Sequence, residues 1–406
     1  MKSSFIVRAL LAVLCAGSAG AISLYDTAPM VGLPQSHTAR YGAYASVGYD
    51  SNMNATHSNQ TSSPFVRAGV DASFADYESV DKITYRLNLG MTHYLESSNS
   101  RSYGSNNGKQ SFADLGATAT LVHAFNSRSS YMASLNLTYS PEPDYSTGIS
   151  ASRRQGECFN WAFNNSYNQS IDSRWSWNVN AAYSGLLYSE TEYQSDDRQY
   201  FTLGAGMSYR ASEVLSYKVN FSYKNDRRDY GYNSDNMTLM FGFDRALDPL
   251  SSCSVSVGVQ QKYIHNESFL SPNIRLGYNR KAAEGFSVNS YAVLSNENVD
   301  TYRGANLNYL SDLTLRVGVD GVYTLSPDVS FTFGISVLRS QYSKGTYRME
   351  DETNLTYRPH VGMNYKFSEK LTGNIRYEYT FYDADKHRTN ADYSRHVIST
   401  GINYTF

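Results

Sequence analysis

Charged side chains recur in this sequence at positions that alternate with apolar ones. Arg67 and Asp71, for example, alternate with Val66, Ala68 and Val70. Successive side chains of a β-strand point to opposite faces, so this spacing places charges on one face and apolar groups on the other. The positions that share the charged face, and that we predict to line a pore, are Arg67, Asp71, Arg86, Asp114, Arg174, Arg210, Lys218, Lys224, Asp244, Arg275, Arg316, Asp320, Arg358, Arg376, Glu378 and Arg395.

The chemistry of this charged face is that of a solvated, weakly cationic surface. Arg and Lys outnumber Asp and Glu on it, and Asn and Ser occupy many of the remaining positions. Fixed positive charges attract anions, whereas amides and hydroxyls hydrogen-bond hydroxylated solutes such as sugars. The alternative at each single position is polar filling without a function. A whole-chain net charge of −2 gives no basic footprint for nucleic acid.

Motifs of common catalytic and metal sites do not occur. The sequence contains no G-x-S-x-G, H-E-x-x-H or C-x-x-C pattern. An acidic stretch that includes Asp383, Asp385, Asn390 and Asp392 lacks the spacing of an EF-hand. We interpret this stretch as a solvated loop, with weak calcium binding as the alternative. We therefore expect no enzyme activity, no cofactor and no metal centre.

The elements that position these residues are strands. The two-residue period runs almost without interruption from Tyr41 to Phe406, and Tyr, with 36 residues, is unusually frequent. Each strand supplies about 9–11 alternating residues, enough to cross a bilayer when tilted. Strands in lipid must close on themselves, because an open edge would leave backbone groups unpaired. We therefore predict an all-β fold, a closed antiparallel transmembrane β-barrel of about eighteen strands over residues 41–406.

Sixteen strands is the alternative, and the doubtful pair covers Ile274–Tyr278 and Phe286–Leu294. The connections alternate between short turns, such as Phe125–Ser129, and longer polar loops, such as Pro141–Gly156. Short periplasmic turns opposite long outer loops are typical of transmembrane barrels.

Cys158 and Cys253 begin strands six and eleven near opposite rims, and a bridge needs Cα atoms within about 7 Å, so we predict no disulfide.

Residues 1–21 have the pattern of a secretory signal peptide. Lys2 and Arg8 supply positive charge, Ala9–Ala16 is apolar, and Ala19-Gly20-Ala21 offers small residues for cleavage. The apolar run is too short to span a membrane. Residues 22–40 have no clear period and are predicted to form a periplasmic N-terminal extension.

The final stretch, His396–Phe406, is an amphipathic strand with Ile398, Ile402, Tyr404 and Phe406 on one face. It resembles the closing strand of Gram-negative outer-membrane barrels. That resemblance implies that Tyr404 and Phe406 serve as the assembly signal for the barrel assembly machinery.

A second resemblance rests on the turn after the first strand, Gly48-Tyr49-Asp50-Ser51-Asn52, together with Phe406. This turn resembles that of the β-barrel porin-2 family of bacterial outer membranes. Membership would imply a barrel in the cell outer membrane, in contact with lipid and lipopolysaccharide. Some members of the family accompany exopolysaccharide export genes.

The leading functional prediction is a passive porin for small hydrophilic solutes with a mild anion preference, because no globular plug domain precedes the barrel. Two alternatives remain open at this point. A partner in exopolysaccharide export would make periplasmic contacts through residues 22–40. A surface adhesin would carry its selectivity in the Ser-, Asn- and Tyr-rich loops. Substrate, pore radius and oligomeric state are not predicted.

Overall fold

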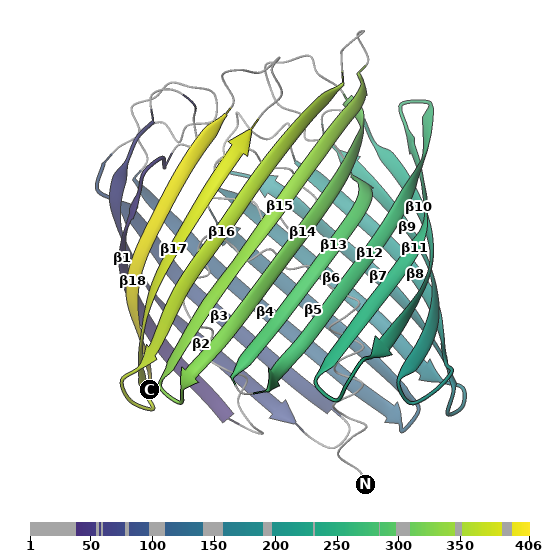
Figure 1. The fold of residues 1–406 in the computed structure, drawn as a ribbon, viewed down its shortest axis with the longest axis horizontal. Coiled ribbons are helices and arrows are strands. Elements are labelled where there is room, and N and C mark those ends of the chain that lie inside the picture. Colours follow the sequence, from purple (N-terminus) through teal and green to yellow (C-terminus); the bar gives the residue numbers. More distant parts are fainter. Residues whose placement is uncertain are drawn as a thin grey trace.

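The computed structural model describes residues 38–53, 57, 60–77, 81–96, 110–140, 157–189, 197–229, 232–283, 285–297, 309–345, 351–383 and 392–406. Within these ranges the chain forms one antiparallel sheet of 18 strands (Figure 1). The strands are β1 (Thr38–Asp50), β2 (Ser63–Tyr77), β3 (Asp81–Tyr94), β4 (Ser111–Asn126), β5 (Ser129–Ser140), β6 (Cys158–Ser170), β7 (Trp175–Tyr188), β8 (Arg198–Arg210), β9 (Leu215–Arg228), β10 (Ser234–Ala246), β11 (Ser251–Ile264), β12 (Glu267–Ala283), β13 (Phe286–Glu297), β14 (Tyr309–Ser326), β15 (Val329–Gly345), β16 (Glu352–Lys366), β17 (Leu371–Asp383) and β18 (Tyr393–Thr405). No helix in the described part of the chain is long and apolar enough to cross a membrane.

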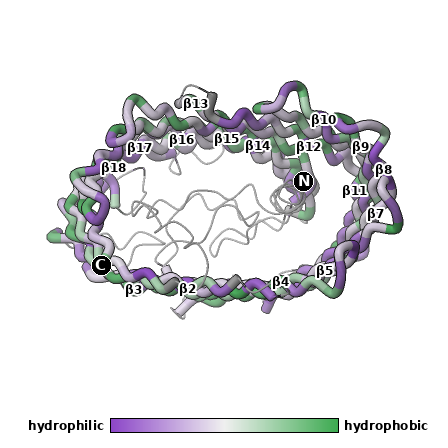
Figure 2. The backbone as a smooth tube through the Cα atoms, turned by 90° about the horizontal axis from the view of Figure 1, so that it is seen from below, coloured by the Kyte–Doolittle hydropathy of each residue, from purple (hydrophilic) through white to green (hydrophobic). Residues whose placement is uncertain are grey.

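The sheet closes into a barrel through its first and last strands. Each strand pairs with its neighbours in sequence, and β1 pairs with β18 from Gly42↔Thr405 to Asp50↔Val397. Figure 2, seen from below, shows the strands as an oval ring. Closure satisfies the backbone hydrogen bonds that an open edge would leave unpaired. The predicted closed barrel of about eighteen strands is confirmed, and the doubtful pair corresponds to the two strands β12 and β13.

Short turns lie at one end of the barrel and longer connections at the other; we call these the short-turn end and the long-loop end. One connection at the long-loop end departs from the predicted alternation. β11 and β12 are joined by His265 and Asn266 alone, with φ of 49° and 61°. Two consecutive positive φ values define the tight hairpin turn that matches strand twist. Both strands are therefore longer than the sequence predicted. Its apolar alternation marked only Val255 to Val259 in β11 and Ile274 to Tyr278 in β12.

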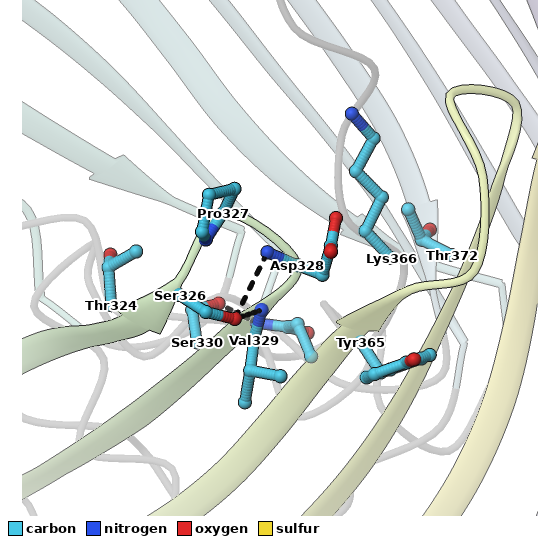
Figure 3. Close-up of a pocket in the computed structure, with 10 residues that line it drawn as sticks. Thr324, Ser326, Pro327, Asp328, Val329, Ser330, Tyr365, Lys366 and Thr372 are labelled. Atoms are coloured by element: carbon cyan, nitrogen blue, oxygen red, sulfur yellow. Dashed lines mark hydrogen bonds between the residues drawn. The ribbon is translucent and has the colours of Figure 1, made fainter.

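Six of the short turns share one local hydrogen-bond pattern. A side-chain oxygen on the first turn residue accepts hydrogen bonds from backbone amides two or three residues later, which fixes the reversal. Figure 3 shows Ser326, whose Oγ accepts from the amides of Asp328 at 3.3 Å and Val329 at 3.2 Å. The residues that act in this way are Asn126, Asp172, Ser212, Asp248, Ser326 and Ser368.

The turn at Asp172 gives a pH-dependent prediction. Hydrogen bonds from the amides of Trp175 and Arg174 hold the pKa of the Asp172 carboxyl below its ordinary value. A lowered folded-state pKa contributes stability above the unfolded-state pKa of about 4, and this contribution is lost as the pH falls through the folded-state value. Replacing Asp172 with Ala should therefore lower the urea midpoint at neutral pH and have a shrinking effect below about pH 4.

Ser326→Ala is the matched control for this prediction, because its hydroxyl accepts equivalent bonds and does not titrate. Its effect on the urea midpoint should be independent of pH. Parallel pH profiles for the two variants would show that the Asp172 carboxylate is not the titrating group.

Most large apolar side chains lie on the outside of the barrel, and smaller buried clusters, such as the one around Phe65 and Phe112, lie on its inside. Val70, Leu87, Val179 and Ile398 are all more than two-fifths exposed. Aromatic rings are in contact toward both ends of this surface, as in Trp175–Tyr209 and Tyr404–Phe406 at the short-turn end. Toward the long-loop end the ring contacts include Phe159–Trp161 and Trp161–Tyr183. The result is an outward apolar band with aromatic residues at its two borders.

β1 begins at Thr38, so Thr38–Arg40, predicted to belong to the extension, are part of the first strand. The predicted signal peptide, residues 1–21, and the rest of the predicted extension lie outside the described residues. At the other end of the chain, the amide of Phe406 donates to the carbonyl of Tyr41 at 2.9 Å.

Candidate functional site

Most of the predicted pore-lining residues lie on the interior face of the sheet. Arg67 is 5% exposed, whereas its neighbour Val66 on the outer face is 44% exposed. The same alternation and the strand register place the remaining members on the interior face: Asp71, Arg86, Asp114, Lys218, Lys224, Asp244, Arg275, Arg316, Asp320, Arg358, Arg376, Glu378 and Arg395. Arg174 departs from the prediction, because it lies in the turn before β7 and donates to the outward Tyr209 hydroxyl at 3.4 Å. Arg210 is the exposed last residue of β8.

The charged interior residues form several separate groups. The first lies at the junction of β1 and β18, which we call the seam. Arg395 binds the Asp50 carboxylate through Nε at 2.9 and 3.1 Å and through Nη2 at 2.5 Å. Asp50 is fully buried and Arg395 is 4% exposed. The Tyr94 hydroxyl donates to Asp50 at 3.3 Å, and the Asn52 amide donates to it at 3.1 Å.

The turn motif that carries the family resemblance is therefore built around the seam. Next to Asp50, the amide of Ser51 donates to the His396 carbonyl at 3.0 Å, and the Ser51 Oγ accepts from the His396 amide at 2.8 Å. The Asn52 side chain donates to the Ser394 carbonyl at 3.0 Å. Each polar member of the motif thus ties the end of β1 to the start of β18.

A second group links β1 to β4 across the interior face. Arg67 pairs with Asp114, which lies two strands away. The Tyr44 ring lies 5.5 Å from the Arg67 guanidinium, and the Tyr44 hydroxyl donates to Asn88 at 3.1 Å. A cation over an aromatic face is attracted by the ring quadrupole. Arg67 and Asp114 were each predicted from the sequence, but their pairing was not.

A third group occupies β14, β16 and β17. Glu378 accepts from Arg358 and from Arg376, each at 3.1 Å. Nearby, the His360 Nε2 lies 3.7 Å from the Asp320 carboxylate. Two guanidinium groups around one carboxylate leave local positive charge on this part of the interior.

The fourth group, which we call the basic cluster, lies on the interior faces of β8 to β14. Lys224 lies 4.2 Å from the centre of the Tyr200 ring. Arg316 binds Glu297 at 2.5 and 3.0 Å, and the fully buried Lys262 donates to the Glu297 carbonyl at 2.7 Å. The cluster comprises Arg198, Lys224, Arg228, Lys262, Arg275 and Arg316, with the acidic residues Asp226, Glu297 and Asp312 among them.

Sequence reasoning missed part of this cluster, namely Arg198, Asp226, Arg228, Lys262, Glu297 and Asp312. The polar stretches Asn225–Asn236 and Asn296–Asn308 were predicted to be long loops, which placed Asp226 and Glu297 outside the strands. In the structure β9 continues to Arg228 and β13 to Glu297. Asp226 and Arg228 keep the parity of Lys224, so extending the period by two residues would have found them.

The cationic residues of the cluster differ in how far their charge is compensated. Arg316 is paired with Glu297, whereas Lys224 and Arg275 form no ion pair with a described carboxylate. Arg275 is also exposed on the interior face. The local positive charge is therefore concentrated at Lys224 and Arg275.

No group of three or more His, Cys, Asp or Glu residues in the described ranges is arranged to hold a metal ion. A pocket of about 290 Å³ lies at the short-turn end, against the β14–β15 turn (Figure 3). Ser326, Asp328, Lys366 and Thr372 are among the residues that line it. Within the described chain, Cys158 is buried, Cys253 is partly buried, and neither forms a disulfide.

These features define an antiparallel barrel with an apolar outside and a charged inside. No family model matches the chain, and no curated protein matches it. Among solved structures, the chain is similar to OccAB4 of Acinetobacter baumannii, with 13% identity over 92% of this chain and 99% of that one, at a TM-score of 0.48. It is also similar to a BenF-like porin of Pseudomonas fluorescens Pf-5, with 8% identity over 91% and 100% of the two chains, at a TM-score of 0.49.

A third similar structure is the outer membrane protein opdK of Pseudomonas aeruginosa, with 10% identity over 91% of this chain and 99% of that one, at a TM-score of 0.47. At these levels of similarity, the barrel architecture rests on the strand pairing of the chain itself. That architecture is the one that the family resemblance implied.

Proposed function

We propose that this protein is a channel of the cell outer membrane that passes small hydrophilic solutes. The observation that carries the proposal is the inverted polarity of the barrel. Its outer surface bears exposed apolar residues such as Leu87 and Ile398, while charged residues such as Arg67 and Glu378 lie on the interior face. A closed sheet with an apolar outer band, aromatic borders and a polar interior is the arrangement that lipid requires.

In this proposal the long connections face the outside of the cell and the short turns face the periplasm. Recognition of Tyr404 and Phe406 by the barrel assembly machinery stays a prediction. The mild anion preference is the finer part of the proposal. It is supported by the basic cluster, since fixed charges on low-dielectric walls raise the local concentration of counter-ions.

The test of ion preference is a reversal potential across a salt gradient in planar bilayers. The wild type should prefer anions, and Lys224→Gln with Arg275→Gln should lower the anion-to-cation permeability ratio roughly two-fold, because it removes two positive charges that form no ion pair with a described carboxylate. Arg316 and Arg376 are less suitable targets, because they pair with Glu297 and Glu378. The preference should weaken above about 0.1 M salt, where the Debye length falls below about 10 Å.

The matched control is the double change Lys218→Gln with Asp244→Asn. It removes both members of the interior pair, whose atoms lie 2.6 Å apart, and so leaves the net charge unchanged. Its permeability ratio should equal that of the wild type. Cation preference in the wild type would contradict the role given to the basic cluster. Absence of conductance would contradict the channel and favour an export partner or an adhesin.

A further inference from the structure

One part of the barrel wall differs from the rest in having no charge. Among the described residues, β5, β6 and β7 are the strands without any Asp, Glu, Lys or Arg, and they are adjacent. Their interior positions carry amides and hydroxyls instead. We call the interior faces of these three strands the neutral wall. The charged groups described above lie on the other strands of the ring.

Amides of the neutral wall lie in register with one another and with an amide of β9. Asn168 of β6 is paired with Asn178 of β7, which is paired with Gly206 of β8, which in turn is paired with Asn220 of β9. Asn180 lies two residues beyond Asn178 on the same face of β7 and is paired with Gly204 of β8. Neighbouring strands lie about 4.8 Å apart and alternate residues of a strand about 6.7 Å apart, so these amides form a regular array.

The hydrogen-bonding groups of this array are not used by the protein. The side chains of Asn168, Asn178, Asn180 and Asn220 make no hydrogen bond with a described residue, and the three on β6 and β7 are partly exposed. Several interior amides elsewhere are occupied. The Asn273 side chain donates to the Gln260 Oε1 at 3.1 Å, and the Asn296 side chain donates to the Ser311 Oγ at 2.8 Å. The array therefore offers donors and acceptors that a solute can use.

The glycines of β8 help to shape this array. A Cβ at Gly206 would overlap the side-chain oxygens of Asn178 and Asn220, and one at Gly204 would overlap the amide of Asn180. With glycine at these two positions, the side chains of Asn178, Asn180 and Asn220 lie against the β8 backbone. The array thus extends from β6 to β9.

From this arrangement we infer that the neutral wall binds uncharged, hydroxyl-rich solutes of the carbohydrate class during their passage. A sugar hydroxyl both donates and accepts hydrogen bonds. The side-chain amide of Asn can accept from it through its carbonyl oxygen and donate to it through its NH₂ group, so no charged group is needed. Because the surface is uncharged, it does not concentrate salt ions that would compete for it. The inference rests on the proposed channel function and names a substrate class for it.

The test uses maltohexaose as the probe and the full-length purified protein in planar bilayers. Wild-type ion current should show reversible interruptions as maltohexaose is added. The double variant Asn178→Leu with Asn180→Leu removes two amides at nearly constant volume and should raise the half-blocking concentration about ten-fold. Its heat-modifiable gel mobility should match the wild type, which shows that the barrel is folded.

The matched control is Asn279→Leu with Asn289→Leu, a pair of facing interior amides on β12 and β13, outside the neutral wall. Its half-blocking concentration should stay within about two-fold of the wild type. An equal shift in both double variants would overturn the assignment to the neutral wall, as would conduction that is indifferent to maltohexaose.

A second measurement separates this inference from the channel itself. Saturation-transfer NMR of maltohexaose with the detergent-solubilised barrel reports binding without conduction. Binding to the wild type that is lost in the Asn178→Leu, Asn180→Leu variant would support the neutral wall, whether or not the barrel conducts. Binding without ion conduction would overturn only the proposed channel. Ion conduction without binding overturns only the neutral wall.

Discussion

Replacing Leu87 with Arg should destabilise the barrel in lipid by roughly 2–4 kcal/mol. Leu87 lies near the middle of β3, faces outward and is 53% exposed. In the proposed orientation this position is at the centre of the apolar band, where a guanidinium group loses its hydration. The measurement is urea unfolding of the barrel in lipid vesicles, followed by tryptophan fluorescence.

The matched control for this prediction is Ile83→Arg, on the same strand and face but close to the short-turn end. Charge near the membrane surface should cost about 0–1 kcal/mol, because the side chain reaches water. If the two variants lose the same stability, the apolar band is not centred on the middle of the strands. If neither loses any, the outer surface does not face lipid.

The seam gives the second large effect. Asp50→Ala should cost about 3–5 kcal/mol, because it leaves the buried Arg395 guanidinium without its carboxylate. It also removes the acceptor of the Tyr94 hydroxyl and the Asn52 amide. Adding Arg395→Met to Asp50→Ala should recover much of the loss, since the uncompensated charge is then gone.

Asp244→Ala is the comparison for the seam, because its pair with Lys218 is much more exposed. Exposed ion pairs contribute about 0–1 kcal/mol, so this variant should stay close to the wild type in urea unfolding. A double variant at Asp50 and Arg395 that is no more stable than Asp50→Ala alone would show that the unpaired charge is not the cause of the loss.

The alternation of apolar and polar residues predicted the closed barrel and the interior position of most charged residues. This succeeded because alternation is local: the period of two places each side chain on a face without knowledge of its partners. The pairing of charges could not be predicted in the same way. Arg67 and Asp114 lie on strands separated by β3, and Asp50 and Arg395 lie 345 residues apart, so their contact depends on register and closure.

Strand ends were the weaker part of the prediction. Asp226, Arg228 and Lys262 continue the interior parity, but polar residues next to a polar loop give no apolar contrast that marks where a strand stops. Arg174 shows the opposite error, because a period was extended into a turn where the alternation no longer applies. The sequence showed Asp50, Ser51 and Asn52 only as a motif. Their contacts with β18 at the seam depend on the pairing of β1 with β18, which the structure provides.

The bond between the Phe406 amide and the Tyr41 carbonyl, 2.9 Å long, brings the first and last strands together at the rim that carries the short turns. A short peptide linker could therefore join the two strands there, and the chain could be opened instead at an exposed turn such as the one at Asp248. Such a circular permutant would keep the same strands, the same register and the same seam contacts. The arrangement of the strands in the closed barrel therefore does not depend on which strand comes first in the sequence.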